Sequence, residues 1–444
     1  MNQTINRRDF VKKASASSLG LSFLSSTAPF INSKSNANDN IQVAIMGTNN
    51  RGSALAKGFA KLKGIEVGYI CDVDDQAIKK GMDATAQGGQ KKKPKTEKDI
   101  RKVLDDKSVD AIVIAAPDHW HAPAAIMALQ AGKHVYVEKP CSHNPEEGEM
   151  LVQAAQNSDL IVQMGNQRRS WPKVVEGIAK LKDGVIGRAY YAKAWYANNR
   201  QPIGFGKNTA VPAGLDYELW QGPAPRKAYQ DNIIHYNWHW FWHWGTGELL
   251  NNGTHFIDLC RWGLEVDYPN RVSSGGGRYA YKDDWETPDT QITHYDFDDQ
   301  KSITWEGRSC NRQNIEGISA GAAFHAENGT MVIDANGYHI YDNNNQLIES
   351  STSSSATATN TTGPGFDLDQ DHLENFRTSI INNKRPVSYI EDANISVHIC
   401  HLGNIAHRVG RSLECNPRNG KITGDEEAMK LWGRSYEAGW KPSV

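Results

Sequence analysis

Short apolar segments alternate with helical segments between residues 40 and 166, and this alternation constrains the fold more than any other feature of the chain. The segment at 110–116 is nearly continuous in apolar residues, as a strand buried on both faces requires. The apolar segments lie at 41–46, 65–71, 110–116, 134–137 and 160–164, with helical spacing at 53–62, 74–86, 99–105, 122–130 and 145–157. This order predicts an α/β fold whose first domain, residues 40–166, is a parallel, doubly wound sheet.

The pattern changes after residue 166. A stretch rich in Trp, His, Asn and Pro, residues 197–244, is followed by segments in which apolar and polar residues alternate. We expect a second α+β domain, residues 167–444, with an open, mainly antiparallel sheet that could pair subunits into a homo-oligomer. Its expected strands are 189–196, 291–297, 302–306, 329–333 and 338–341, and its expected helices are 171–181, 247–262, 370–381, 392–413 and 425–431. The Ser/Thr-rich segment 350–362 predicts a surface loop.

The N-terminal residues differ from the rest of the chain. Arg7 and Arg8 precede Phe10 and a weakly apolar, serine-rich stretch at 14–31. This pattern is typical of a twin-arginine export signal and predicts a signal peptide over residues 1–37 and a periplasmic protein. The alternative is a basic tail. The apolar stretch is too polar for a membrane span, so we expect no integral membrane association.

Charge and cysteine content narrow the function classes. Lys and Arg number 49 against 51 Asp and Glu, a net charge of −2, which argues against a nucleic-acid-binding surface. The six cysteines show no paired spacing and no CxxC motif, so we expect buried free thiols.

A turn of sequence Gly47-Thr48-Asn49-Asn50-Arg51-Gly52 joins the first strand to the first helix. Gly47 permits a tight bend, Gly52 permits close packing of helix on strand, and the helix N-terminus offers N–H groups to a pyrophosphate. Asn49 replaces the usual second glycine, and Asn tolerates a left-handed backbone. Asp72 ends the next strand, where its carboxylate would bind ribose hydroxyls and disfavour a 2′-phosphate. The turn therefore predicts NAD rather than NADP; a purely structural turn is the alternative.

Lys139 lies where the strand at 134–137 stops at Pro140, which cannot donate to a sheet ladder. Open α/β sheets bind ligands at the carboxyl edge of their strands. We therefore expect Lys139 beside the nicotinamide ring.

Four parts of the chain together resemble the Gfo/Idh/MocA oxidoreductases. They are the turn at 47–52, the motifs Pro117-Asp118-His119-Trp120-His121 and Glu138-Lys139-Pro140, and the segment at 247–258. The resemblance implies a Rossmann domain, bound NAD(P), and sugar or polyol substrates. It places a lysine beside the nicotinamide at Lys139 and an acid–base histidine at His255. It also implies cofactor contacts from Gly47, Asn49, Asn50, Arg51, Gly52, Asp72, Pro117, His119, Trp120, His121, Glu138 and Lys139.

The chain departs from this family at Asn251. Many members carry an aspartate four residues before the histidine, and Asn251 cannot take a proton as a carboxylate does. We expect a lower pKa at His255 unless another carboxylate, such as Glu248, is its partner. Asn251 is then expected to position a substrate hydroxyl.

Aromatic and histidine side chains crowd residues 237–244, and this favours the wall of a sugar pocket. One alternative is that these side chains only pack in the core. A metal site is another alternative, because His239 and His243 have i,i+4 spacing. No third ligand is fixed beside them, so we expect no metal. Arg168 follows the last strand of the first domain and could reach the substrate, or form a surface pair with Arg169. The candidate substrate contacts are Lys139, Arg168, Trp238, His239, Trp240, His243, Asn251 and His255.

Three functions remain open. The leading hypothesis is an exported NAD(P)-dependent oxidoreductase that transfers a hydride between a sugar or glycoside hydroxyl carbon and a tightly bound nicotinamide. The second is a redox-neutral glycoside hydrolase or lyase that acts through a transient keto-sugar. The third is a non-catalytic carbohydrate-binding protein on a dehydrogenase scaffold.

Overall fold

The computed structural model describes residues 40–334, 337–352 and 366–444. The expected signal peptide lies outside these residues, and so does most of the Ser/Thr-rich segment at 350–362.

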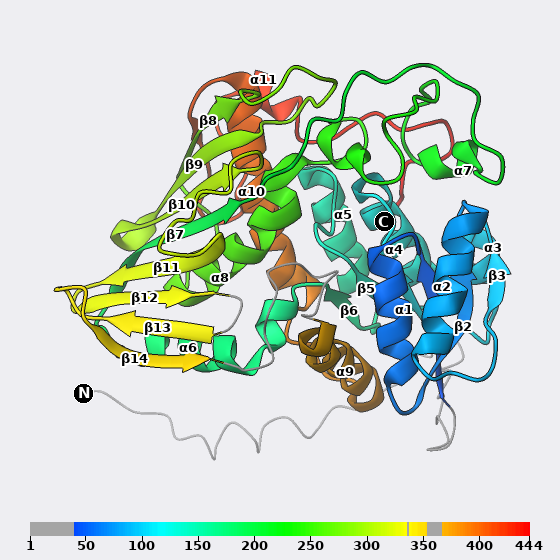
Figure 1. Ribbon diagram of the computed structural model, residues 1–444, viewed down its shortest axis with the longest axis horizontal. Coiled ribbons are helices and arrows are strands. Elements are labelled where there is room, and N and C mark those ends of the chain that lie inside the picture. The colour runs from blue at the N-terminus through cyan, green and yellow to red at the C-terminus, as the bar shows by residue number, and fades with distance from the viewer. Residues whose placement is uncertain (1–39, 335–336, 353–365) are drawn as a thin grey trace, which may run out of the picture. The chain divides into compact units, whose positions relative to one another are not determined.

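The first sheet has six strands, all parallel, in the order β3-β2-β1-β4-β5-β6 (Figure 1, blue to cyan). The strand order reverses direction between β1 and β4, and ligands of doubly wound sheets bind at such a switch point. The sequence did not indicate the three-residue edge strand β3, which is too short to show a pattern. The strands are β1 (Ile41–Met46), β2 (Ile65–Cys71), β3 (Lys95–Glu97), β4 (Ala111–Ile114), β5 (His134–Val137) and β6 (Val162–Met164).

Five helices connect these strands: α1 (Arg51–Lys61), α2 (Asp75–Gln87), α3 (Ile100–Asp105), α4 (Asp118–Gln130) and α5 (Pro145–Gln156). Helix α4 begins four residues before the expected start. The polar side chains of its first turn are buried against other segments, so the spacing of apolar residues does not mark them. This early start places the residues after Pro117 at the edge of the sheet.

The second sheet has nine strands in the order β14-β13-β12-β11-β7-β10-β9-β8-β15, of which β7 to β14 are the yellow and green arrows of Figure 1. Only the β7–β10 pair is parallel, so the prediction of a mainly antiparallel sheet is confirmed. Strands β8, β11 and β14 were not expected, because they are rich in glycine, alanine or serine. Strand β15 was not expected either, since its first residue was assigned to the helix at 392–413, which ends at Val409. The strands are β7 (Ala189–Ala197), β8 (Arg271–Gly277), β9 (Thr290–Phe297), β10 (Lys301–Arg308), β11 (Ala320–Ala326), β12 (Gly329–Ile333), β13 (Gly337–Tyr341), β14 (Leu347–Thr352) and β15 (Leu413–Glu414).

Helices α6, α8 and α10 pack against the second sheet, and α10 also contacts α5 and β6. One hydrophobic cluster contains buried residues of both sheets, including Ile114, Val137, Trp305 and Phe324. The two sheets therefore share a core. The remaining helices are α6 (Pro172–Lys182), α7 (Tyr217–Gln221), α8 (Thr254–Leu264), α9 (Phe366–Asn382), α10 (Ile390–Val409) and α11 (Glu426–Met429), with 3₁₀ segments at Gln167–Ser170, Asn237–Trp240 and Asp298–Gln300 and a π-helical segment at Leu249–Gly253.

All six cysteines are unpaired, and all but Cys310 are buried, as expected. Within the described ranges, none of the helices combines the length and apolar character needed to cross a membrane.

Candidate active site

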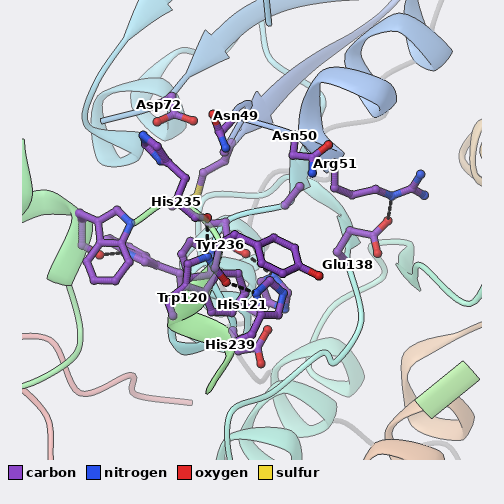
Figure 2. A pocket seen from close by; sticks show the side chains of 18 of the residues that line it. Asn49, Asn50, Arg51, Asp72, Trp120, His121, Glu138, His235, Tyr236 and His239 are labelled. Atoms are coloured by element: carbon purple, nitrogen blue, oxygen red, sulfur yellow. Dashed lines mark hydrogen bonds and ion pairs between the residues drawn. The ribbon is translucent and has the colours of Figure 1, made fainter. Parts of the chain in front are cut away.

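A cavity of about 460 Å³ lies at the carboxyl ends of β1, β2, β4 and β5, facing residues between 196 and 255. Figure 2 shows Asn49, Asn50, Arg51 and Asp72 on one side, and Trp120, His121, Tyr236 and His239 on the other. The structure thus brings together most of the candidate residues, namely Gly47, Asn49, Asn50, Arg51, Asp72, Pro117, Trp120, His121, Glu138, Lys139, Trp238, His239, Asn251 and His255.

The turn after β1 fits a pyrophosphate. Gly47 has a φ of 82°, and a Cβ on it would lie 2.7 Å from the Ala115 carbonyl oxygen. A Cβ on Gly52 would collide with the Gly47 carbonyl oxygen, at 1.7 Å, so the turn lies directly on α1. Asn50 makes no side-chain cap hydrogen bond. The Ser53 and Ala54 N–H groups donate to the Asn50 carbonyl oxygen at 3.1 and 3.3 Å, and the partial positive charge of this helix N-terminus favours an anion.

Asp72 is held in place by the backbone. Its carboxylate accepts hydrogen bonds from the amide N–H of Thr48 at 2.5 Å and of Asp74 at 3.1 Å. Burial raises its pKa, and those two hydrogen bonds oppose the shift. Asp72 is thus a fixed acceptor at the cavity wall, as a ribose partner must be.

Arg51 and Glu138 form an ion pair in the cavity wall (Figure 2). Arg51 Nε donates to Glu138 Oε1 at 2.7 Å, and Arg51 Nη1 lies 2.5 Å from Asp369 of α9. These ion pairs tie the start of α1 to the end of β5 and to α9. Both residues line the cavity, and their charged groups hold these three segments together.

Lys139 is positioned by the π-helical segment. Its Nζ donates to the backbone oxygen of Asn251 at 2.8 Å and to the side-chain Oδ1 of the same residue at 3.0 Å. A π-helical turn disrupts the regular α-helical ladder and is frequent at functional sites. Burial lowers the pKa of Lys139, and the carboxylates of Glu138 and Asp118 partly oppose the shift. The amine is therefore more readily deprotonated than a surface lysine.

His255 lies in the first turn of α8, 3% exposed, and lines the cavity. Its Nδ1 is buried and has no hydrogen-bond partner among the described residues. Burial lowers the pKa of His255 well below its ordinary value, and the positive charges of Arg168 and Lys139 add to the shift. The imidazole is therefore neutral at neutral pH and able to accept a proton.

Glu248 is not the partner of His255. Its carboxylate binds Arg200 Nε at 2.7 Å and the Ser309 hydroxyl at 2.9 Å, and it accepts from the Asn252 amide. The pKa of His255 is lower than usual, as expected, and the causes are its burial and the nearby cations.

The sequence did not reveal several cavity residues, namely Tyr196, Asn198 and Arg200 at the end of β7, together with Tyr236 and Asn252. The alternation of apolar and polar residues indicated strand β7. It did not indicate that the end of this strand lines the same cavity as the strand ends of the first sheet. Beside them, His239 stacks on Trp238 with ring centroids 3.6 Å apart, and burial lowers the pKa of His239 to about 3.

Five candidate residues do not line the cavity: Gly52, His119, Arg168, Trp240 and His243. His119 packs between two tryptophans, with its ring nitrogens 3.0 Å from the Trp220 oxygen and 3.3 Å from the Trp244 oxygen. Trp240 stacks on Trp285, and His243 lies 2.8 Å from the Pro225 oxygen.

Arg168 is not a surface residue. Its guanidinium is buried over the rings of Trp171 and Phe256, at 5.0 and 4.4 Å. His239 and His243 do not meet a third ligand; across the described part of the chain, no three His, Cys, Asp or Glu side chains are placed to hold a metal ion.

Two family models match the chain. Residues 41–166 match the model described as Gfo/Idh/MocA oxidoreductase family, NAD-binding Rossmann fold. Residues 195–442 match the model of the same family's C-terminal alpha/beta domain.

Curated relatives share part of the sequence. A glycosyl hydrolase family 109 protein of Shewanella pealeana is 28% identical over 211 residues, which are 43% of this chain and 46% of the relative. One of Saccharopolyspora erythraea is 27% identical over 208 residues, 44% of this chain and 45% of the relative. The chain thus matches about half the length of these relatives.

Solved structures share the fold. Myo-inositol 2-dehydrogenase from Lactobacillus plantarum superposes with a TM-score of 0.63 at 19% identity, covering 85% of this chain and 100% of that one. Levoglucosan dehydrogenase in complex with NADH and levoglucosan gives a TM-score of 0.63 at 17% identity, covering 85% and 99%.

Proposed function

Because the chain belongs to the Gfo/Idh/MocA oxidoreductase family, we propose that it transfers a hydride between a hydroxyl-bearing carbon of a sugar or glycoside and a nicotinamide cofactor. One observation carries this proposal. A single cavity is lined by the glycine turn, by Lys139 and by His255. The dinucleotide would lie along the turn and Asp72, with its reactive ring toward Lys139. NAD is the favoured form, since the Asp72 carboxylate would repel a 2′-phosphate.

The bound cofactor would supply the hydride acceptor, and the residues of this chain would place the substrate and move its proton. His255, neutral and without a partner for Nδ1 among the described residues, is suited to take the hydroxyl proton. Lys139 can donate to the reacting oxygen while Asn251 holds its amine in place. Acid–base assistance of this kind contributes about 10²–10⁴-fold to the rate.

The aromatic wall suits a carbohydrate. Sugars present apolar C–H faces and polar hydroxyls, and Trp238 and Tyr236 line the cavity together with Asn198, Asn252 and His239. The Arg200–Glu248 pair cancels the charge on this side. We therefore expect an uncharged sugar or glycoside.

A second candidate is redox-neutral glycoside cleavage, in which the sugar is oxidised, the aglycone is eliminated, water adds to the resulting unsaturated ketone and the hydride is returned. That cycle needs proton transfers at both oxygen and carbon. Three basic groups that line the cavity have a lowered pKa, namely Lys139, His255 and His239, and the first two are the candidates for these transfers. The curated relatives named as glycosyl hydrolase family 109 proteins also favour this candidate.

Product analysis separates the candidates. The purified protein is first examined by absorbance and mass for a copurified cofactor, and is then incubated with a panel of glycosides. A keto-sugar with stoichiometric NADH indicates net oxidation, and a free sugar without net redox change indicates cleavage. Sugar binding without either product, unchanged in Lys139→Ala, indicates the non-catalytic alternative and contradicts the proposal.

We also propose export to the periplasm and assembly into a homo-oligomer through the second sheet. The arginine pair at Arg7 and Arg8 supports export, and the open sheet supports assembly. Cell fractionation of the double variant Arg7→Lys, Arg8→Lys tests export. If the arginine pair directs export, the variant protein is retained in the cytoplasm, whereas unchanged export would contradict the proposal. Light scattering of the purified protein tests assembly, and a monomer would contradict it.

A further inference from the structure

The carboxylate of Glu248 lies at the centre of a hydrogen-bond network beside the candidate active site. Glu248 is 4% exposed and directly precedes the π-helical segment. Its Oε2 accepts from Arg200 Nε at 2.7 Å and from the Ser309 hydroxyl at 2.9 Å. Its Oε1 accepts from Arg200 Nη2 at 3.3 Å, from Asn251 Nδ2 at 3.3 Å and from the Asn252 amide. The carboxylate thus joins the segments that follow β7 and β10 to the π-helical segment.

Glu248 is ionised at neutral pH. Burial alone would raise its pKa, but the Arg200 guanidinium and the hydrogen bonds from Asn252 and Ser309 outweigh burial, so its pKa is lowered. An ionised carboxylate accepts hydrogen bonds and cannot donate one. Each polar neighbour of Glu248 must therefore present a donor to it.

This requirement fixes the orientation of the Asn251 side chain. Asn251 Nδ2 donates to Glu248, and Asn251 Oδ1 accepts from Lys139 Nζ at 3.0 Å. A protonated lysine can only donate. In the reversed orientation of the amide, two donors would meet at Lys139 and two acceptors would meet at Glu248. Only the orientation in the structure satisfies both charged groups.

The Asn251 side chain in turn sets the direction of the Lys139 amine. Lys139 Nζ donates to the backbone oxygen of Asn251 at 2.8 Å as well as to Oδ1. A protonated amine carries three N–H donors, so these two contacts fix the direction of the third. Lys139 lines the main cavity, whereas Glu248 does not. A misplacement of about 1 Å at a reacting group can cost about 10²-fold in rate.

We propose that Glu248 is a positioning residue, which orients the Asn251 amide so that this amide holds the Lys139 amine in its reactive direction. The proposal rests on the proposed function, because it assigns Lys139 to the reaction. It also explains why position 251 is Asn here, where many family members carry aspartate. A carboxylate at position 251 would lie about 3.3 Å from Glu248 Oε1, and like charges at that distance repel each other.

A double-mutant cycle tests the proposal. Glu248→Gln keeps an oxygen for Arg200 only if its new amide turns toward Asn251, which reverses the Asn251 amide. We expect kcat to fall at least about tenfold, with smaller changes in KM and in cofactor affinity. Asn251→Asp places two carboxylates together, and we expect a similar loss of kcat.

In the double variant, the new amide at position 248 can donate to the new carboxylate at position 251, which accepts from Lys139. We expect its kcat to exceed the value given by the product of the two single losses by at least about tenfold. Single losses that simply multiply would overturn the proposal. If Glu248→Gln does not fold, the comparison of the double variant with Asn251→Asp decides, since the double variant must be the more active.

Glu147→Gln is the matched control. Glu147 is also fully buried and ion-paired, with Arg434 Nε at 2.7 Å, and it does not line the main cavity. We expect this variant to have a lower melting temperature but an unchanged kcat. A loss of kcat in Glu248→Gln no larger than in Glu147→Gln would show that Glu248 only stabilises the fold, and would contradict the proposal.

A measurement without substrate separates this proposal from the proposed function. The rate at which acetic anhydride acetylates Lys139 is read by peptide mass spectrometry in the wild type and in Glu248→Gln. Burial lowers the pKa of Lys139, and Glu248 opposes the shift together with Glu138 and Asp118. Glu248→Gln frees the amine from one contact and favours its deprotonated form, so acetylation should be at least about threefold faster. An unchanged rate overturns the positioning role, whereas faster acetylation in a protein that converts no glycoside contradicts only the proposed function.

Discussion

At the scale of single residues, the candidate chemistry depends on side chains whose pKa values are lowered by burial. Lys139 and Asn251 are 112 positions apart, yet the lysine amine bonds both oxygens of Asn251. His255 is kept neutral by burial and by neighbouring cations. The sequence identifies these residues, but only their surroundings give them usable protonation states.

Removing either group tests these roles. We expect Lys139→Ala and His255→Ala each to lower turnover at least about 10²-fold while cofactor binding persists. The control is Lys182→Ala, whose ion pair with Glu265 is at the surface and contributes little. Steady-state kinetics with cofactor fluorescence titration measures both quantities, and unchanged turnover in both site variants would refute the assignment.

Asp72 is expected to set cofactor preference. Asp72→Ser removes the charge that would repel a 2′-phosphate, so the ratio of NADP to NAD affinity should rise at least about tenfold. The variant also removes the acceptor of the Thr48 and Asp74 N–H groups. Measuring both dissociation constants separates the roles, because a purely structural role would weaken both cofactors equally.

At the scale of elements, the close approach of the β1–α1 turn to β4 shapes the dinucleotide site. Gly47 has a positive φ and lies against the Ala115 backbone. The π-helical segment before α8 has a similar role for the other wall, because it presents the Asn251 carbonyl to Lys139. Both features, the turn and the π-helical segment, depend on backbone geometry rather than on the identity of a side chain.

A matched pair of glycine variants tests the turn. We expect Gly47→Ala to store about 1–3 kcal/mol of backbone strain, to lower the melting temperature and to weaken cofactor binding more than tenfold. Gly275→Ala in β8 is the control, because its added Cβ meets nothing within 4 Å. Equal effects of both variants on cofactor binding would show that the turn has no special role.

At the scale of the whole molecule, burial of histidines couples stability to pH. Burial lowers the pKa of His119 and His401 to about 3, and of His134, His372 and His398 to about 4. In the unfolded chain these groups titrate near pH 6.5. Below that pH the unfolded state binds more protons than the native state, so the free energy of unfolding falls as pH falls.

We therefore expect stability to decrease between pH 6.5 and about pH 4.5, by up to about 1.4 kcal/mol per pH unit for each such histidine. The buried carboxyls of Asp72, Asp118 and Asp369, whose pKa values burial raises, offset part of this loss. Urea unfolding at a series of pH values measures the slope. Stability that is constant or rising on acidification would contradict the expectation.

The sequence determined the alternation of strands and helices, the glycine turn, the position of Lys139 and the family to which the chain belongs, because these depend on local spacing and on motifs a few residues long. The tertiary structure alone decided which side chains meet. It brought Tyr196 and Arg200 to the cavity from the end of β7, directed His119 and Trp240 away from it, and paired Glu248 with Arg200 rather than with His255. Those contacts join residues far apart in the chain, and so they follow from how the two sheets pack on their shared core.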